Sequence, residues 1–341
     1  MGSVMESEIC EIPGVFKKLI THIEQYSVAG DLIKTKDIKS ILVLARGTSD
    51  NAAHFLKYLI ETQLGLPVGL TSPSSVTIYK TKLHFQNTLV VALSQSGQST
   101  DLVEYATAAK ASGATLISLT NDEHSPLAQL ADVHLSLMAG KEIAVAATKS
   151  YAAQLLSSLL LVSAWSGKVF DLDSLVTESS AMLSKVNLTD EAIGHCNPKN
   201  EIVVLGRGFS YPNAREAALK IQETSKISVQ GLSIADYMHG PISALTSSTR
   251  VVVMAPNGFA MTAIESDIAK IRKQSPQIIW VGSSQLANPD DVVISGSHCD
   301  SEILASIVDA IALQMFALKF ARKNSLDPDN PAGLSKVTHT I

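Results

Sequence analysis

Short apolar runs rich in branched residues alternate with amphipathic stretches along the chain. In the first half these runs cover residues 40–44, 88–93, 114–119 and 133–137. Strands of a parallel sheet are buried on both faces and therefore form nearly continuous apolar runs, while the longer stretches between them supply the crossover helices. The pattern predicts an α/β fold in which helices sandwich a parallel sheet.

The same order of runs returns in the second half, at residues 201–205, 249–255, 277–281 and 291–295. The segment Leu42-Val-Leu-Ala-Arg-Gly-Thr-Ser49 aligns with Val203-Val-Leu-Gly-Arg-Gly-Phe-Ser210, and the offset of about 160 residues is nearly kept for the later runs. Repetition of this kind indicates a duplicated structural unit. We therefore expect two tandem flavodoxin-like domains.

The chain is predicted to have five segments. They are a helical extension at 1–26 with a helix at 15–26, a first domain at 27–167, a helical linker at 168–195, a second domain at 196–326 and a tail at 327–341. Pro328 and Pro331 exclude a continued helix in the tail. The apolar stretch at 155–165 is interrupted by serines. It is also shorter than the roughly 20 residues that span a bilayer, so we expect a buried helix there.

Loops rich in small and hydroxyl-bearing residues follow the predicted strands. Ser94-Gln-Ser-Gly-Gln-Ser99 follows one strand and precedes a helix, and Arg46-Gly-Thr-Ser-Asp50 does the same after the preceding strand. Hydroxyls and backbone N–H groups at a helix N-terminus can hold a phosphate dianion without a cation. The alternative is a plain helix cap by Ser99 or Thr100. A third loop of small residues, 144–150, could close over a sugar by backbone contacts.

Composition and charge narrow the choice of ligands and partners. A net charge of −5 over 341 residues offers no basic surface for nucleic acid or an anionic membrane. The three cysteines are far apart and the nine histidines are scattered, so we expect reduced thiols, no metal site and a cytoplasmic location. No dinucleotide-binding glycine fingerprint and no Gly-Lys-Ser/Thr loop follows a strand, and we expect no cofactor.

Five ordered blocks of sequence carry a resemblance to a known family. From about Val15 to the C-terminus the chain resembles tandem sugar isomerase (SIS) domains, as in the isomerase half of glutamine:fructose-6-phosphate aminotransferase. The blocks are Ser94-Gln-Ser-Gly97, Glu142-Ile-Ala-Val-Ala-Ala-Thr-Lys149, Ala218-Leu-Lys-Ile-Gln-Glu223, Met238-His-Gly-Pro241 and Asp327-Pro-Asp-Asn-Pro-Ala-Gly-Leu-Ser-Lys336.

The resemblance implies a phosphosugar site and four catalytic side chains. Glu223 matches the base that moves a proton between C1 and C2, Lys220 precedes it by one helical turn, and His239 matches a ring-opening residue supplied by the partner subunit of a homodimer. Lys336 matches a lysine that forms a Schiff base, so we expect the tail to act as a lid. The implied contacts to the phosphate and sugar come from Gly47, Thr48, Ser49, Ser94, Gln95, Ser96, Gly97, Ser99, Val145, Ala147, Thr148 and Ser335.

The chain also departs from the aminotransferase. It lacks the glutaminase domain with its N-terminal catalytic cysteine, so we expect the reverse half-reaction, in which a glucosamine-6-phosphate deaminase releases fructose 6-phosphate and ammonium. Alternatives are a galactosamine-6-phosphate deaminase, a fructosamine-phosphate deglycase and, from another class, a non-catalytic phosphosugar sensor. Pro256-Asn-Gly258 replaces the serine-rich loop in the second copy. We therefore expect that the second copy has lost phosphate binding.

Overall fold

The computed structural model describes residues 3–185, 188–274 and 276–336. These residues form two compact units. The first-sheet unit comprises residues 14–142, 149–170 and 335–336, and the second-sheet unit comprises residues 3–13, 143–148 and 171–334. The chain therefore crosses between units several times, and most of the segment predicted as a linker groups with the second-sheet unit.

The first-sheet unit contains a five-stranded, fully parallel sheet with the strand order β2-β1-β3-β4-β5. Its strands are β1 (Ser40–Leu44), β2 (Gly69–Leu70), β3 (Thr88–Ser94), β4 (Thr115–Thr120) and β5 (Val133–Ser136). All seven residues of β3 are buried, as expected for a central parallel strand that helices cover on both faces.

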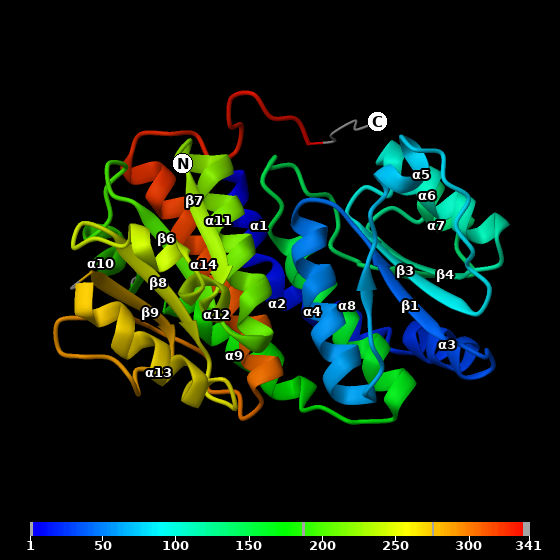
Figure 1. Ribbon diagram of the computed structural model, residues 1–341, viewed down its shortest axis with the longest axis horizontal. Helices are drawn as coiled ribbons and strands as arrows, with labels where there is room; N and C mark the ends of the chain where they lie inside the picture. The colour runs from blue at the N-terminus through cyan, green and yellow to red at the C-terminus, as the bar shows by residue number, and fades with distance from the viewer. Residues whose placement is uncertain (1–2, 186–187, 275, 337–341) are drawn as a thin grey trace. The chain divides into compact units, whose positions relative to one another are not determined.

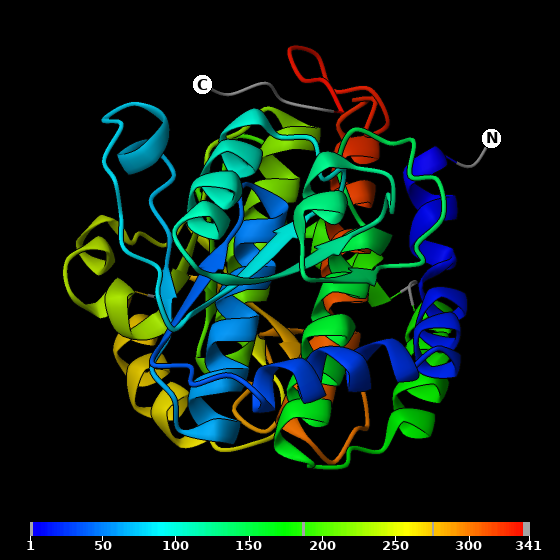
Figure 2. The same ribbon diagram turned by 90° about the vertical axis from the view of Figure 1, so that its right-hand side faces the viewer.

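Helices cover both faces of this sheet. One face carries α3 (Glu24–Lys34), α4 (Thr48–Leu64) and α8 (Lys149–Ser166), and the other carries α5 (Ser74–Thr77), α6 (Thr100–Ala111) and α7 (Pro126–Leu130). The two layers are visible on either side of the strands in Figure 1, and Figure 2 shows α6 and α7 in front of them. Gly30 lets α3 approach α8 closely, because a Cβ there would lie 2.9 Å from the Ala164 carbonyl carbon.

The second-sheet unit repeats the topology with the order β10-β9-β8-β6-β7, again fully parallel. Its strands are β6 (Ile202–Gly206), β7 (Val229–Ser233), β8 (Arg250–Ala255), β9 (Gln277–Gly282) and β10 (Val292–Ser295). In both sheets the second strand in sequence lies outside the first, and the remaining strands follow on the other side. The predicted duplication of a flavodoxin-like α/β unit is confirmed.

Its helices form equivalent layers. On one face lie α11 (Tyr211–Ser225) and α14 (Glu302–Lys323), and α1 (Val4–Cys10), α9 (Leu172–Ser184) and α10 (Leu188–Gly194) pack against α14. The other face carries α12 (Ile234–Met238) and α13 (Met261–Ile271), whose apolar residues enclose Trp280. The 3₁₀ helices are η1 (Gly208–Ser210), η2 (Pro241–Ala244) and η3 (Arg272–Gln274).

The predicted elements differ from the observed ones in three places. The edge strands β2 and β7 were not predicted, because β2 has only two residues and β7 contains Gly231 in place of a continuous apolar run. The helix predicted at 15–26 is two helices, α2 (Ile12–Thr21) and α3, and α3 continues to Lys34 because Ala29, Gly30 and Ile33 extend its buried face.

The apolar stretch at 155–165 lies in α8 and is buried, as predicted. Among the described residues, α14 is the one helix long and apolar enough to cross a membrane. Its most apolar stretch of 18 residues is, however, 94% buried inside the protein, as in a core helix.

Candidate active site

The carboxyl ends of β1 and β3 meet at one edge of the first sheet. The two strands pair in parallel, with Leu44 opposite Ala92, so the loops that follow them lie beside each other. The chain order reverses between these strands, since β2 lies beyond β1 and β4 beyond β3. Ligands of open α/β sheets bind at such a switch point. The predicted Gly47–Ser49 and Ser94–Ser99 segments are thus brought together.

Two helix N-termini point into this edge without side-chain caps. Gly47, with φ +56°, is the N-cap residue of α4, and Ser99 is the N-cap residue of α6; neither makes a side-chain capping hydrogen bond. The alternative of a plain cap by Ser99 is therefore not observed. Two uncapped N-termini give positive dipole ends and backbone donors to an anion at one place.

Internal hydrogen bonds hold the loop after β3. The Gly97 N–H donates to Ser94 Oγ at 3.0 Å, and the Gln98 N–H donates to Ser96 Oγ at 3.3 Å. Gly97 has φ +64°, and a Cβ there would lie 2.2 Å from Ser125 Oγ, so only glycine fits. Because both serine oxygens act as acceptors within the loop, their hydroxyl hydrogens remain available to donate to a ligand.

A cation lies beside the loop, in contrast to the cation-free site that the sequence suggested. Arg46 Nε donates to Asp101 Oδ2 at 2.8 Å, and Asp101, in the first turn of α6, is 1% exposed. The Arg46 side chain is 51% exposed, and within the described residues it makes no other hydrogen bond. Its two terminal amino groups can therefore contact an anion at the start of α6.

Ser49 is positioned by a buried amide. Gln154 Nε2, on α8, donates to Ser49 Oγ at 2.8 Å, and Gln154 is fully buried. This bond fixes the serine oxygen and leaves its hydrogen as a donor. Neither Gln154 nor Asp101 was predicted, because each acts through a neighbour that is distant in the sequence.

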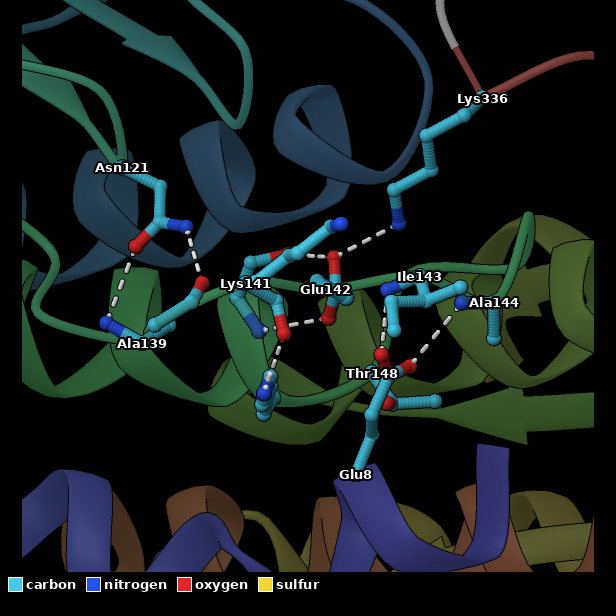
Figure 3. Close-up of polar contacts among 12 residues, drawn as sticks. Glu8, Asn121, Ala139, Lys141, Glu142, Ile143, Ala144, Thr148 and Lys336 are labelled. Carbon is cyan, nitrogen blue, oxygen red and sulfur yellow. Dashed lines mark hydrogen bonds and ion pairs between the residues drawn. The ribbon is translucent and has the colours of Figure 1, made fainter. Parts of the chain in front are cut away.

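Lys336 forms an ion pair with a buried carboxylate (Figure 3). Its Nζ lies 2.9 Å from Glu142 Oε2, and the Glu142 side chain is fully buried. The same carboxylate accepts hydrogen bonds from the Ser150 hydroxyl at 2.7 Å and from the Ser150 N–H at 3.1 Å. Ser335 and Lys336 thus belong to the first-sheet unit. Glu142 lies in one of the five blocks that resemble the family, but the sequence predicted no role for it.

The loop 143–148 belongs to the second-sheet unit. The N–H groups of Ile143 and Ala144 donate to the Glu8 carboxylate, and the Val145 N–H donates to the Asp329 carbonyl at 3.1 Å. Gln314 Nε2 donates to the Thr148 carbonyl at 3.0 Å. Together these bonds fix the backbone that carries Val145, Ala147 and Thr148.

The tail from Asp327 to Lys336 is an ordered loop. The Asp329 carboxylate accepts the N–H groups of Val4 and Met5, both at 2.8 Å, at the start of α1. A carboxylate at that position satisfies donors that the helix itself leaves unpaired. The tail is therefore held in place by specific bonds, although the lid function itself stays a prediction.

The predicted base lies on α11 in a group of three charges. Lys220 Nζ is 2.5 Å from Glu223 Oε2 and 3.4 Å from Glu216 Oε1. Lys220 is 1% exposed, whereas the Glu223 side chain keeps 22% exposure. Lys220 and Glu223 therefore do not form a solvated surface ion pair. Glu216 was missed, although its spacing of four residues from Lys220 on one helix face would have indicated it.

His239 lies on a separate element, directly after α12, and is exposed. Among the described residues its imidazole makes no hydrogen bond or ion pair. Lys220, Glu223 and His239 all belong to the second-sheet unit.

Both halves of the chain match one family. Residues 35–164 and 196–321 fit the model of the SIS domain. The chain belongs to the SIS domain family. It is 31% identical to a glutamine–fructose-6-phosphate aminotransferase (isomerizing) of Pyrococcus horikoshii over 97% of this chain and 57% of the relative. The chain thus spans little more than half the length of such relatives.

Two solved structures are similar in fold over nearly the whole chain. A putative phosphosugar isomerase from Silicibacter pomeroyi has 27% identity and a TM-score of 0.86, covering 96% of this chain and all of that one. The glucosamine-6-phosphate deaminase of Thermotoga maritima has 21% identity and a TM-score of 0.80, covering 99% and 100%. At that identity the second likeness shows the fold alone.

The second SIS domain has a carboxylate where the first has its serine-rich loop. Glu302 accepts the Ala260 N–H at 3.4 Å, and a Cβ on Gly258 would lie 2.3 Å from Glu302 Oε2. Burial raises the pKa of Glu302, and the backbone hydrogen bonds from Ala260 and Phe259 oppose that shift. A carboxyl group in this place competes with phosphate for the same N–H donors, which supports the expected loss of phosphate binding.

Proposed function

We propose that this protein is a hexosamine-phosphate deaminase that converts glucosamine 6-phosphate and water to fructose 6-phosphate and ammonium. The observation that carries the proposal is the arrangement on α11. A buried ammonium, Lys220, holds one oxygen of Glu223, and the Glu223 carboxylate keeps partial access to solvent. A carboxylate oriented in this way can remove a proton from one carbon and return it to the next.

The reaction runs through an open-chain sugar. Once the ring is open, Glu223 takes the proton from C2 and returns it to C1, which converts the 2-amino aldose to the C2 imine of the ketose. The Lys336 amine then displaces ammonia from C2, and water hydrolyses the new imine to release the ketose and the free amine. Sugar, nitrogen and water balance, and no redox partner is consumed.

The phosphate is assigned to the first SIS domain. The hydrogen-bond donors for the phosphate lie at one edge of the first sheet. They are the uncapped N-termini of α4 and α6, the serine hydroxyls and the Arg46 guanidinium. The imidazole of His239 is exposed and makes no hydrogen bond to the residues that the structure describes, which supports its assignment as the ring-opening acid and base, acting across a homodimer interface. We assign no cofactor to any of these steps.

The direction of the reaction is part of this proposal. Glu223 as the base, Lys336 as the amine and the phosphate site of the first SIS domain are the groups that we assign to ammonium release.

Ammonium release from glucosamine 6-phosphate tests the proposal, with galactosamine 6-phosphate and fructoselysine 6-phosphate run in parallel. Release from the first substrate that is lost in Glu223→Gln supports the deaminase and its base together. Release from another substrate keeps the mechanism and changes the substrate. Tight phosphosugar binding without release from any of them would make the protein a sensor and refute the proposal.

A further inference from the structure

Glu142 is a preformed buried anion. Its Oε1 accepts the N–H of Ser150, the second residue of α8, and its Oε2 accepts the Ser150 hydroxyl. The N-terminal end of a helix stabilises negative charge, and a buried carboxylate is tolerated only when such donors surround it. Two of the groups that donate to it belong to one residue of α8, Ser150. Lys336 therefore meets a carboxylate that other groups of the first-sheet unit already hold in place.

The segment that carries Glu142 is held at several points (Figure 3). The Ala139 N–H donates to Asn121 Oδ1 at 3.0 Å, and Asn121 Nδ2 donates to the Gly140 carbonyl at 2.6 Å. Lys149 Nζ donates to the Lys141 carbonyl at 2.8 Å. These bonds link the segment to the end of β4 and the start of α8, so the carboxylate stands on rigid elements.

Lys336 remains reachable from solvent. Its side chain is 24% exposed, while that of Glu142 is fully buried. Only the amine can therefore meet a sugar carbonyl. An ammonium cannot attack a carbonyl carbon, because its nitrogen has no free electron pair, and a proton must first leave. Glu142 Oε2, 2.9 Å from Nζ, is within the distance at which a general base acts.

We propose that Glu142 is the proton acceptor that activates Lys336 for imine formation; this inference rests on the proposed function. With fructose 6-phosphate, in the reverse of the final hydrolysis, Glu142 takes one proton from the ammonium, and the amine nitrogen forms a bond to the carbonyl carbon. A proton moves from nitrogen to oxygen, which gives the carbinolamine. Glu142 then returns its proton to the hydroxyl, the C–O bond breaks and water leaves, so that ammonium and ketone have become protonated imine and water and Glu142 is a carboxylate again.

The simpler alternative is that Glu142 only holds Lys336 in position through the ion pair. The two roles differ in their pH dependence. If Glu142 only positions Lys336, its loss slows imine formation by the same factor at every pH. If it is the base, the loss is greatest at low pH and shrinks as the pH rises, because the growing hydroxide concentration supplies another base for the same proton.

The experiment traps the imine on the full-length protein with fructose 6-phosphate and sodium cyanoborohydride between pH 6 and 9, and locates the adduct by peptide mass. Wild type is expected to carry the adduct on Lys336, and Lys336→Arg none. Glu142→Gln is expected to trap about 100-fold more slowly at pH 7 and to recover as the pH rises. Glu142→Asp, which keeps the charge but shortens the reach, is expected to recover part of the rate with the wild-type pH profile.

Asp132→Asn is the matched control. Asp132 also accepts a lysine Nζ at 2.9 Å, from Lys110, and a backbone N–H at 2.8 Å, from Leu116, but it has no role in the site. It is expected to trap at the wild-type rate. If Glu142→Gln does not fold, Glu142→Asp decides, since trapping at the full wild-type rate by this shorter side chain would overturn the proposal.

The outcomes separate this inference from the proposed function. A pH-independent deficit in Glu142→Gln, or no deficit, overturns the role of Glu142. Ammonium release from glucosamine 6-phosphate by wild type without any Lys336 adduct overturns the role of Glu142 but leaves the deaminase standing. If wild type neither releases ammonium nor forms the Lys336 adduct, both the deaminase and the role of Glu142 are overturned.

Discussion

Lys220 offers a sharp test of the charge arrangement on α11. Its ammonium is 1% exposed and lies 2.5 Å from Glu223 and 3.4 Å from Glu216, whose side chain is 3% exposed. Replacing Lys220 by Met keeps most of the side-chain volume but removes the ammonium group that lies beside the buried Glu216 carboxylate. Removal of one partner from a buried ion pair typically costs about 3–5 kcal/mol.

We therefore expect Lys220→Met to lower the free energy of unfolding by about 3–5 kcal/mol, measured by urea denaturation at pH 7. The double variant Glu216→Gln/Lys220→Met should recover a large part of that loss, because the buried side chain at position 216 is then neutral. Lys270→Met is the matched control. Lys270 also pairs with an acid three residues away, Asp267, but its side chain is 57% exposed, so we expect a change of less than about 1 kcal/mol. A Lys220→Met variant as stable as the control would refute the reasoning.

Three further predictions concern the loop, the cation beside it and a buried acid. Gly97→Ala should lose phosphosugar binding in calorimetry, whereas Gly140→Ala, with φ +67° but no atom within 4 Å of the new Cβ, should only lose about 1 kcal/mol of stability; equal binding by both would contradict the steric argument. Arg46→Gln should raise the KM for the phosphosugar about tenfold and weaken its salt dependence, and an unchanged KM would remove Arg46 from the site. Burial raises the pKa of Asp309 to about 7, so its favourable contribution to stability is complete below about pH 4 and is lost as the pH rises through 7. Wild type should therefore lose about 3 kcal/mol of stability between pH 5 and pH 8 that Asp309→Asn does not lose, and a curve parallel to wild type in urea titrations at these two pH values would contradict this.

The sequence predicted the strands of both sheets well because a buried parallel strand leaves a continuous apolar run. The strands β1, β3 and β8 begin and end within about one residue of their predicted bounds. The edge strands β2 and β7 leave a weaker pattern, since edge strands are short and need not be apolar on both faces.

The polar partners of the site could not be predicted from the sequence. Asp101 meets Arg46 across 55 residues, Gln154 meets Ser49 across 105, and Lys336 meets Glu142 across 194. Such pairs depend on how the strands and helices pack, and local spacing carries no trace of them. Spacing within one helix does carry a signal, and Lys220 with Glu223 was predicted on that basis.

The most direct test of the account is the reaction of glucosamine 6-phosphate in D₂O, followed by ammonium release and by NMR of the fructose 6-phosphate formed. The account predicts ammonium release with deuterium at C1 in part of the product, because the proton held by the partly exposed Glu223 can exchange with solvent before it is transferred to C1, and loss of both signals in Glu223→Gln. Intact glucosamine 6-phosphate without ammonium or deuterium in the presence of folded wild-type protein would contradict it.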